Sequence, residues 1–180
     1  MSSTKPIGVF DSGLGGLTIV NAITKALPQE KIIYFGDTIH LPYGDKSKKN
    51  IKKYSYNIIK FLIKEGCKLV VIACNSASAT AYSYLKKKFP NVIVLDVITP
   101  LISYLKKDKF LNSSIGVIGT SATINSMVYQ NKINNINRKV KCLATPLLVP
   151  LIENSIKKKN YLNLLLIITW NQINYQKLII

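Results

Sequence analysis

The stretch IGVFDSGLGG, residues 7–16, decides the fold of this chain. It opens with four residues that form a short apolar run typical of a buried strand, and an acidic residue and three glycines follow within the next six positions. A segment with helical periodicity, Leu17–Leu27, comes next. A strand that passes through a small-residue turn into a helix is the first step of a βα unit, and repeated units of this kind build a parallel sheet.

The same alternation continues along the chain. We expect strands over Ile7–Phe10, Ile32–Phe35, Leu69–Ala73, Val92–Leu95, Ile115–Ile118 and Val140–Ala144. We expect helices over Leu17–Leu27, Lys48–Glu65, Ala77–Lys88, Pro100–Lys107 and Ala122–Asn134. Thr99 is the expected N-cap of the fourth helix, with Pro100 at its first position, and Gly66 is the expected C-terminal cap of the second. The pattern predicts the α/β class, with mostly parallel sheets covered on both faces.

The opening stretch also has a repeat. IGVFDS at 7–12 resembles IGVIGT at 115–120, which lies 108 residues later. Both read as a strand that enters a small-residue turn and then a helix. We therefore expect two pseudosymmetric, doubly wound parallel-sheet domains, 1–97 and 98–180, with the second one incomplete.

Composition narrows the class of protein. The chain has 180 residues and is 48% apolar, which is enough to bury a core. No apolar run approaches the roughly 20 residues that span a bilayer, and the N-terminus does not resemble a signal peptide, so we expect a cytoplasmic protein. Three cysteines outside CxxC spacing and a single histidine argue against a disulfide framework and a metal site.

The net charge of +17 allows two interpretations. One is a basic nucleic-acid-binding protein, which would lean on arginine to read phosphate and guanine. Here 24 of the 25 basic residues are lysine, and only Arg138 is arginine. Lysine, isoleucine and asparagine share A/T-rich codons, so compositional drift explains their joint enrichment better. The signature modules of DNA- and RNA-binding proteins are absent as well.

Ligands of open parallel sheets bind beyond the carboxyl ends of the strands, so the turns there are the candidate sites. In the turn 11–16, glycines let the backbone approach a ligand and leave N–H groups for a small anion such as a carboxylate. The alternative is a tight turn in which Asp11 caps the helix. In the turn 119–123, helix capping by hydroxyls is the better interpretation.

Two further turns carry polar residues. Gly36–Thr38 and then Pro42–Gly44 would place backbone and hydroxyl donors beside the first turn, although the second of these segments could also be a plain turn. We interpret His40, in the same loop, as a solvated residue. Cys74 stands at a strand end and a helix start, where the helix dipole is expected to lower the thiol pKa from about 8.5.

A buried core position is the commoner role of an isolated cysteine. We assign Cys67 and Cys142 to that role because neither follows a strand at such a turn.

Taken together, these turns resemble the glutamate racemase family. The resemblance rests on DSGLGGLT at 11–18, YFGDT at 34–38, PYG at 42–44, ACNSASA at 73–79 and IGVIGTSATI at 115–124, and it covers roughly residues 6–160. Aspartate and hydantoin racemases are rivals, but their turns fit DSGLGG and PYG less well.

The resemblance implies two α/β domains with the substrate between them and racemisation of L- and D-glutamate without cofactor or metal. It implies a supply of D-glutamate for peptidoglycan, hence roles in cell-wall biogenesis and cell shape. Glutamate is the implied partner, no specific nucleic acid or membrane is implied, and a homodimer stays open. Cys74 matches a catalytic cysteine, and Asp11 is implied to assist proton transfer. The matching substrate-binding positions are Asp11, Ser12, Tyr43, Gly44, Asn75 and Ser76.

The chain also departs from the family. A second cysteine is expected in a Gly-Cys-Thr-His-like turn, which this sequence lacks, and the repeat offset from Cys74 leads to about position 182. Residues 161–180 stop resembling the family and show no strand-turn-helix plan. Our hypothesis is a frameshift near Tyr161 followed by early termination. The alternative to an active racemase is therefore a non-catalytic remnant that lacks the second catalytic cysteine.

Overall fold

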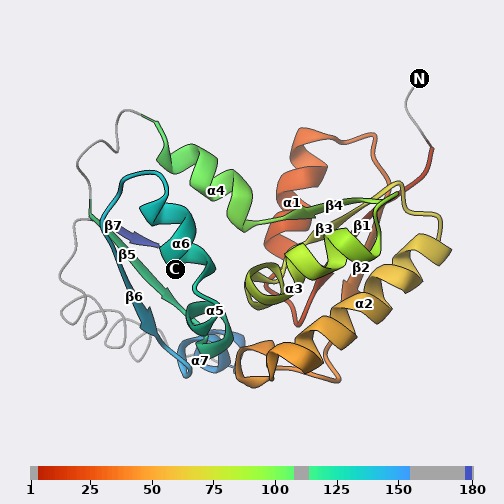
Figure 1. The fold of residues 1–180 in the computed structure, drawn as a ribbon. Coiled ribbons are helices and arrows are strands. Elements are labelled where there is room, and N and C mark those ends of the chain that lie inside the picture. The colour runs from red at the N-terminus through yellow and green to blue at the C-terminus, as the bar shows by residue number, and fades with distance from the viewer. Residues whose placement is uncertain (1–3, 108–113, 155–176, 180) are drawn as a thin grey trace. The chain divides into compact units, whose positions relative to one another are not determined.

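The structure, a computed structural model, describes residues 4–107, 114–154 and 177–179. It divides into two compact units, Met1–Val97 and Ile98–Ile180. Each unit is built on a parallel sheet with helices between successive strands (Figure 1). The expected α/β class is confirmed.

The first sheet has the strand order β2-β1-β3-β4, and every pairing in it is parallel. Its strands are β1 (Ile7–Asp11), β2 (Ile32–Gly36), β3 (Leu69–Ile72) and β4 (Ile93–Asp96). All five residues of the central β1 are buried. Phe10 pairs with Ile72 in register, so the turns that follow β1 and β3 leave the sheet side by side.

Two of the first unit's helices cover one face of this sheet. They are α2 (Lys48–Lys64) and α3 (Asn75–Lys88), which pack on each other and on the strands (Figure 1). A Cβ built at Gly8 would lie 3.1 Å from Leu62 of α2, so the helix sits directly on β1 there. On this face Val70, Ile72 and Val94 are buried, because α2 and α3 exclude water from them.

The opposite face is covered more thinly. It carries α1 (Leu17–Ala26), which has no fully buried side chain. Next to β3, Ile93 and Leu95 of β4 are 60% and 46% exposed. The expectation that both faces are covered therefore holds for the α2–α3 face and is wrong for the β4 end of the other face among the described residues.

The second sheet repeats the plan of the first. Its central strand β5 (Ile115–Gly119) lies between β6 (Val140–Ala144) and β7 (Lys177–Ile179), again in parallel. In the first sheet Ile7 pairs with Leu69, and in the second sheet Ile115 pairs with Lys177. Each residue of the second pair lies 108 positions after its counterpart in the first pair. Within 161–180 the structure describes residues 177–179, which form β7 and pair with the distant β5, and the expectation of no strand-turn-helix plan there otherwise lies outside the described residues.

One expected helix of the second unit is divided into two helices in the structure. The helices of this unit are α4 (Ile98–Leu105), α5 (Ser121–Asn125), α6 (Val128–Asn134) and α7 (Leu148–Asn154). The helix expected over 122–134 is broken at Met127, whose φ of 61° is left-handed. Ser126 stabilises the break, because its hydroxyl donates to the Thr123 carbonyl and accepts the N–H of Val128.

Helix ends follow local chemistry. Gly66, with φ of 80°, follows the C-cap of α2, so the expected glycine cap is confirmed. The fourth helix starts at Ile98, so Thr99 and Pro100 lie inside its first turn and not at its cap. Proline is tolerated there because first-turn N–H groups have no partner within the helix. Within the described ranges, no helix is long and apolar enough to cross a membrane.

Candidate active site at the strand ends of the first unit

The turn after β1 is organised by the Asp11 carboxylate. Its Oδ2 accepts the N–H groups of Gly13 at 3.1 Å and of Gly16 at 3.0 Å. Gly16 is the N-cap of α1, so the buried carboxylate joins the strand end to the helix start. The Tyr34 hydroxyl closes the turn from β2 by donating to the Gly13 carbonyl at 2.7 Å. The structural role considered for Asp11 is therefore present.

Cys74 lies at the neighbouring strand end. It is the N-cap of α3, and its Sγ accepts the N–H of Ala77 at 3.4 Å. The thiol donates to Ser12 Oγ, also at 3.4 Å. Because β1 and β3 are adjacent, Ser12 and Cys74 meet although 62 residues separate them in sequence. The side chain is buried, so the sulfur sits in a protected position among polar groups.

The expected direction of the Cys74 pKa was wrong. Burial raises the pKa of this thiol to about 11, and the negative charge of Asp11 adds to the increase. Hydrogen bonds from Ser12 and from the Ala77 N–H lower the pKa, as the helix start predicts, but they do not outweigh desolvation. In the free protein at neutral pH the sulfur is therefore a thiol.

Tyr43 and Gly44 lie in η1 (Tyr43–Asp45), a short 3-10 helix that contacts α3. Both residues are buried. The Tyr43 hydroxyl donates to Asp37 Oδ2 at 2.6 Å, and burial together with this bond raises the pKa of Tyr43. The negative charge of an ionised Cys74 also contributes to the raised pKa of Tyr43, so the phenol lies within electrostatic reach of the sulfur.

Asn75 and Ser76 are the first two residues of α3, directly after Cys74. Asn75 is exposed and Ser76 is buried. The structure thus brings the residues expected from sequence to the strand ends and following turns of one unit. They are Asp11, Ser12, Tyr43, Gly44, Cys74, Asn75 and Ser76. Their roles toward a ligand stay predictions.

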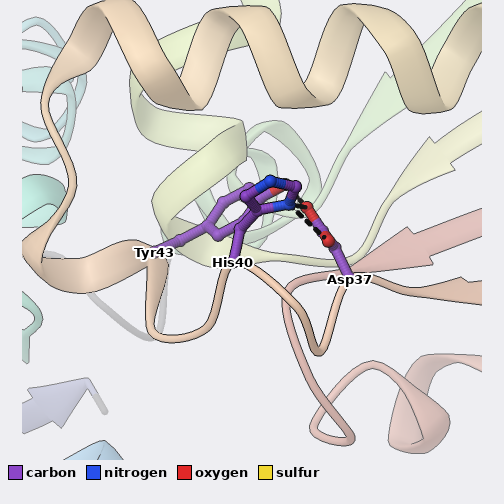
Figure 2. A network of polar contacts seen from close by, with 3 residues as sticks. All are labelled: Asp37, His40 and Tyr43. Atoms are coloured by element: carbon purple, nitrogen blue, oxygen red, sulfur yellow. Dashed lines mark hydrogen bonds and ion pairs between the residues drawn. The ribbon is translucent and has the colours of Figure 1, made fainter.

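Sequence reasoning missed a polar network beside this site, which Figure 2 shows. His40 Nδ1 lies 2.8 and 2.9 Å from the two Asp37 carboxylate oxygens. Its ring stacks on Tyr54 of α2, with centroids 3.8 Å apart. The interpretation of His40 as a solvated loop residue is wrong. The available signal was the three-residue spacing of Asp37 and His40 just before the PYG segment.

The corresponding turn of the second unit carries hydroxyl groups. Thr120 is the N-cap of α5 and accepts the N–H of Thr123 at 3.2 Å, which confirms the expected capping. The other two cysteines lie away from strand-end turns, with Cys67 buried and Cys142 half-buried in β6. In the part of the chain that the structure describes, no group of three or more His, Cys, Asp or Glu residues could hold a metal ion.

Known proteins resemble this chain in both sequence and fold. Residues 11–164 match the family described as Asp/Glu/Hydantoin racemase. A glutamate racemase of Neisseria meningitidis is 47% identical over 152 residues, which cover 83% of this chain and 56% of the relative. One from Streptococcus mutans is 40% identical over 153 residues, covering 84% and 57%. The chain thus spans a little over half the length of these curated relatives.

Solved structures of glutamate racemases have a fold similar to that of this chain. The glutamate racemase of Francisella tularensis in complex with D-glutamate superposes with a TM-score of 0.87 at 38% identity. The match covers 97% of this chain and 67% of that one. The glutamate racemase of Campylobacter jejuni gives a TM-score of 0.86 at 35% identity, with 96% and 70% covered.

Proposed function

The chain belongs to the Asp/Glu/Hydantoin racemase family, and from that premise we propose that it acts on the α-carbon of free glutamate. The product would be D-glutamate for peptidoglycan, made in the cytoplasm without a cofactor. Relatives named glutamate racemase at 40% and 47% identity favour glutamate over aspartate or a hydantoin. A neighbour with a TM-score of 0.87 holds D-glutamate, which supports an amino acid as the ligand.

One observation carries the proposal. Cys74 lies at the start of α3, beside Ser12 and within the electrostatic reach of Asp11. Racemisation needs a group that can take a proton from carbon and return it, and a sulfur that exchanges between thiol and thiolate does both. The Ser12 hydroxyl and the Ala77 N–H favour the thiolate, so they lower the cost of forming the base.

The central step of the proposed reaction is the transfer of the substrate α-proton to the sulfur of Cys74. The Cys74 thiol first releases its proton to solvent, in a transfer that Asp11 is proposed to assist. The resulting thiolate takes the α-proton and becomes a thiol again, while the electron pair of the C–H bond spreads onto the substrate carboxylate. Gly13 and Gly16 give their N–H groups to Asp11, so the groups proposed to stabilise the charge on the substrate are the N–H groups of the α3 start, at Asn75 and Ser76. A second acid on the opposite face would then return a proton and invert the centre. The proposed role of Asp11 is to hold the turn and assist proton transfer.

Solvent-deuterium exchange at the α-carbon tests this function. L- and D-glutamate are incubated separately with the protein in D2O, and label and chirality are followed by NMR. We expect label to enter with the native chain, and Cys74→Ala to slow that entry by about 10²–10⁴-fold. Cys142→Ser is the matched control, because it changes a half-buried cysteine of β6 in the other unit.

The outcomes separate the alternatives. Label with inversion indicates a working racemase, and label without inversion indicates a half-reaction on one face. Absence of label with a folded native chain, verified by circular dichroism, would support the non-catalytic remnant. Exchange that persists in Cys74→Ala would assign the chemistry to another residue.

A further inference from the structure

The loop between β2 and η1 contains a connected set of polar side chains. Asp37 is almost fully buried, with 7% of its side chain exposed, whereas 39% of the His40 side chain is exposed. A carboxylate accepts hydrogen bonds only, so Nδ1 of His40 and the Tyr43 hydroxyl must both donate to it. Figure 2 shows the His40 and Tyr43 side chains converging on the Asp37 carboxylate. Asp37 is thus shared between an outer imidazole and an inner phenol.

Helix α2 fixes the imidazole from a second direction. Tyr54 stacks on the His40 ring with an interplanar angle of 21°, and its ring centroid lies 5.9 Å from that of Tyr43. The ring of His40 is therefore held by a carboxylate at Nδ1 and by an aromatic surface on its face. A solvated loop histidine has neither restraint, so this geometry needs an explanation.

The inner end of the network reaches the candidate site. Tyr43 is the first residue of η1, which contacts α3, and its phenol is close enough to feel the charge of Cys74. The phenol proton is committed to Asp37, so the hydrogen-bond donors that Tyr43 and Gly44 offer to a ligand are those of their backbone. The position of that backbone depends on where Asp37 holds the ring. The position of the buried carboxylate depends in turn on its outer donor, because a buried charge needs its hydrogen-bond partners.

We propose that His40 is a positioning residue of the glutamate site: through Asp37 it holds Tyr43, and with it the backbone of residues 43–44, against the start of α3 where Cys74 lies. Glutamate as the ligand rests on the proposed function above. The positioning itself rests on the contacts of His40, Asp37, Tyr43 and Tyr54. Its loss is expected to weaken ligand binding more than the chemical step, because the network reaches the site through a binding wall.

The first test needs no substrate. His40 is the single histidine among 180 residues, so protein labelled with ¹⁵N-histidine gives one pair of imidazole nitrogen signals. We expect a protonated Nδ1 and a shift of both signals in Asp37→Asn and Tyr43→Phe. Tyr56→Phe is the control, because Tyr56 lies on the same helix as Tyr54 but stacks on Phe89. Signals of a freely averaging imidazole, indifferent to Asp37→Asn, would overturn the proposal.

The second test measures how accessible the Cys74 sulfur is, and it also needs no catalytic turnover. Alkylation of each cysteine by iodoacetamide is followed by peptide mass spectrometry. If His40 holds Tyr43 beside Cys74, His40→Ala should speed alkylation of Cys74 about threefold or more, since local opening exposes the sulfur. Alkylation of Cys142, in the other unit, should not change. Equal rates at Cys74 in the native chain and in the variant would contradict the positioning role.

The third test separates binding from chemistry. In the exchange assay, His40→Ala should raise KM for glutamate about tenfold, the effect of losing one hydrogen bond to a charged group, and leave kcat within about threefold. His40→Asn, whose amide nitrogen occupies the place of Nδ1, should restore most of the loss. His40→Gln, which resembles the Nε2 side of the ring, should not. Equal behaviour of the Asn and Gln variants would refute the role of Nδ1.

The three tests distinguish failure of the proposed glutamate function from failure of the proposed positioning role of His40. Absence of exchange in the native chain, together with faster Cys74 alkylation in His40→Ala, would refute the glutamate function and retain the positioning role. If the native chain exchanges the label, and His40→Ala leaves both KM and the Cys74 alkylation rate unchanged, the glutamate function would be retained and the positioning role refuted.

Discussion

The turns after β1 and β5 occupy the same place in their sheets but carry different chemistry. Each follows a central strand whose two neighbouring strands pair with it in the same register, and the sequences IGVFDS and IGVIGT share their first three residues. The first turn has a carboxylate at Asp11, whereas the second has Gly119 at that position. The backbone plan is therefore shared, and the residue types in the turns decide which unit carries the candidate chemistry.

The two turns are also held together differently. Asp11 accepts two backbone N–H groups with one charged oxygen. At the second turn, Thr120 caps α5 with a neutral hydroxyl. Both turns share one backbone bond, from the Asp37 N–H to the Asp11 carbonyl at 2.9 Å and from the Thr145 N–H to the Gly119 carbonyl at 2.7 Å, so the difference lies in the side chains. Bonds to a buried charge are stronger and less tolerant of change than bonds to a hydroxyl. The first turn should accordingly be the more sensitive of the two.

Glycine substitutions should show the largest difference between the turns. A Cβ at Gly16 would lie 2.6 Å from the Asp11 Cβ and 3.1 Å from the Ala73 Cβ, so Gly16→Ala forces the turn apart. We expect it to lower the free energy of unfolding by about 3 kcal/mol. A Cβ at Gly119 would meet Thr123 at 3.4 Å, an ordinary contact, so Gly119→Ala should cost less than about 1 kcal/mol. Urea denaturation of the matched pair measures both, and equal losses would refute the contrast.

The charge of Asp11 should have an intermediate effect, visible at Cys74. Because the pKa of Cys74 is raised to about 11, its thiolate fraction, and with it alkylation, should climb about tenfold per pH unit between pH 7 and 10. Asp11→Asn removes a negative charge that disfavours the thiolate, so it should lower that pKa and speed alkylation at pH 8. Burial alone raises the pKa of Cys142, whose rate should stay the same. Slower alkylation of Cys74 in Asp11→Asn would show that the charge acts in the opposite sense.

The cap of the second turn should give the smallest effect. Thr120→Ala removes the acceptor of the Thr123 N–H and should cost about 1 kcal/mol of unfolding free energy, as other lost N-caps do. Thr120→Ser keeps the hydroxyl and should cost less than about 0.5 kcal/mol. The same denaturation series measures them. A cost for Thr120→Ala that matched Gly16→Ala would mean that the two turns are equally sensitive.

Elements set by local patterns could be predicted, and elements set by distant contacts could not. The apolar run expected as Ile7–Phe10 became β1, Ile7–Asp11, with one residue added. No glycine or proline lies at the break at Met127 to indicate it in the sequence. The break depends on hydrogen bonds of Ser126. Strand β7 has three residues and owes its existence to β5, more than 60 residues earlier.

The candidate site divides in the same way. Parallel topology was enough to predict that the candidate sites lie at the carboxyl ends of the strands, and the structure shows that two of these turns are neighbours, with Cys74 and Ser12 in hydrogen-bond contact. The pKa of Cys74 was not predictable from its place at a helix start, because burial and the charge of Asp11 raise it. His40 was missed because its stacking partner, Tyr54, comes from another element.

The central claim is that glutamate binds at the strand ends around Cys74. Protection from alkylation tests it most directly, because the three cysteines are read in one experiment. At a D-glutamate concentration ten times its Kd, the bound ligand should cover the sulfur and slow alkylation of Cys74 about tenfold. Cys67 and Cys142 should react at unchanged rates. If D-glutamate left Cys74 as reactive as before, or protected Cys142 equally, the claim would be contradicted.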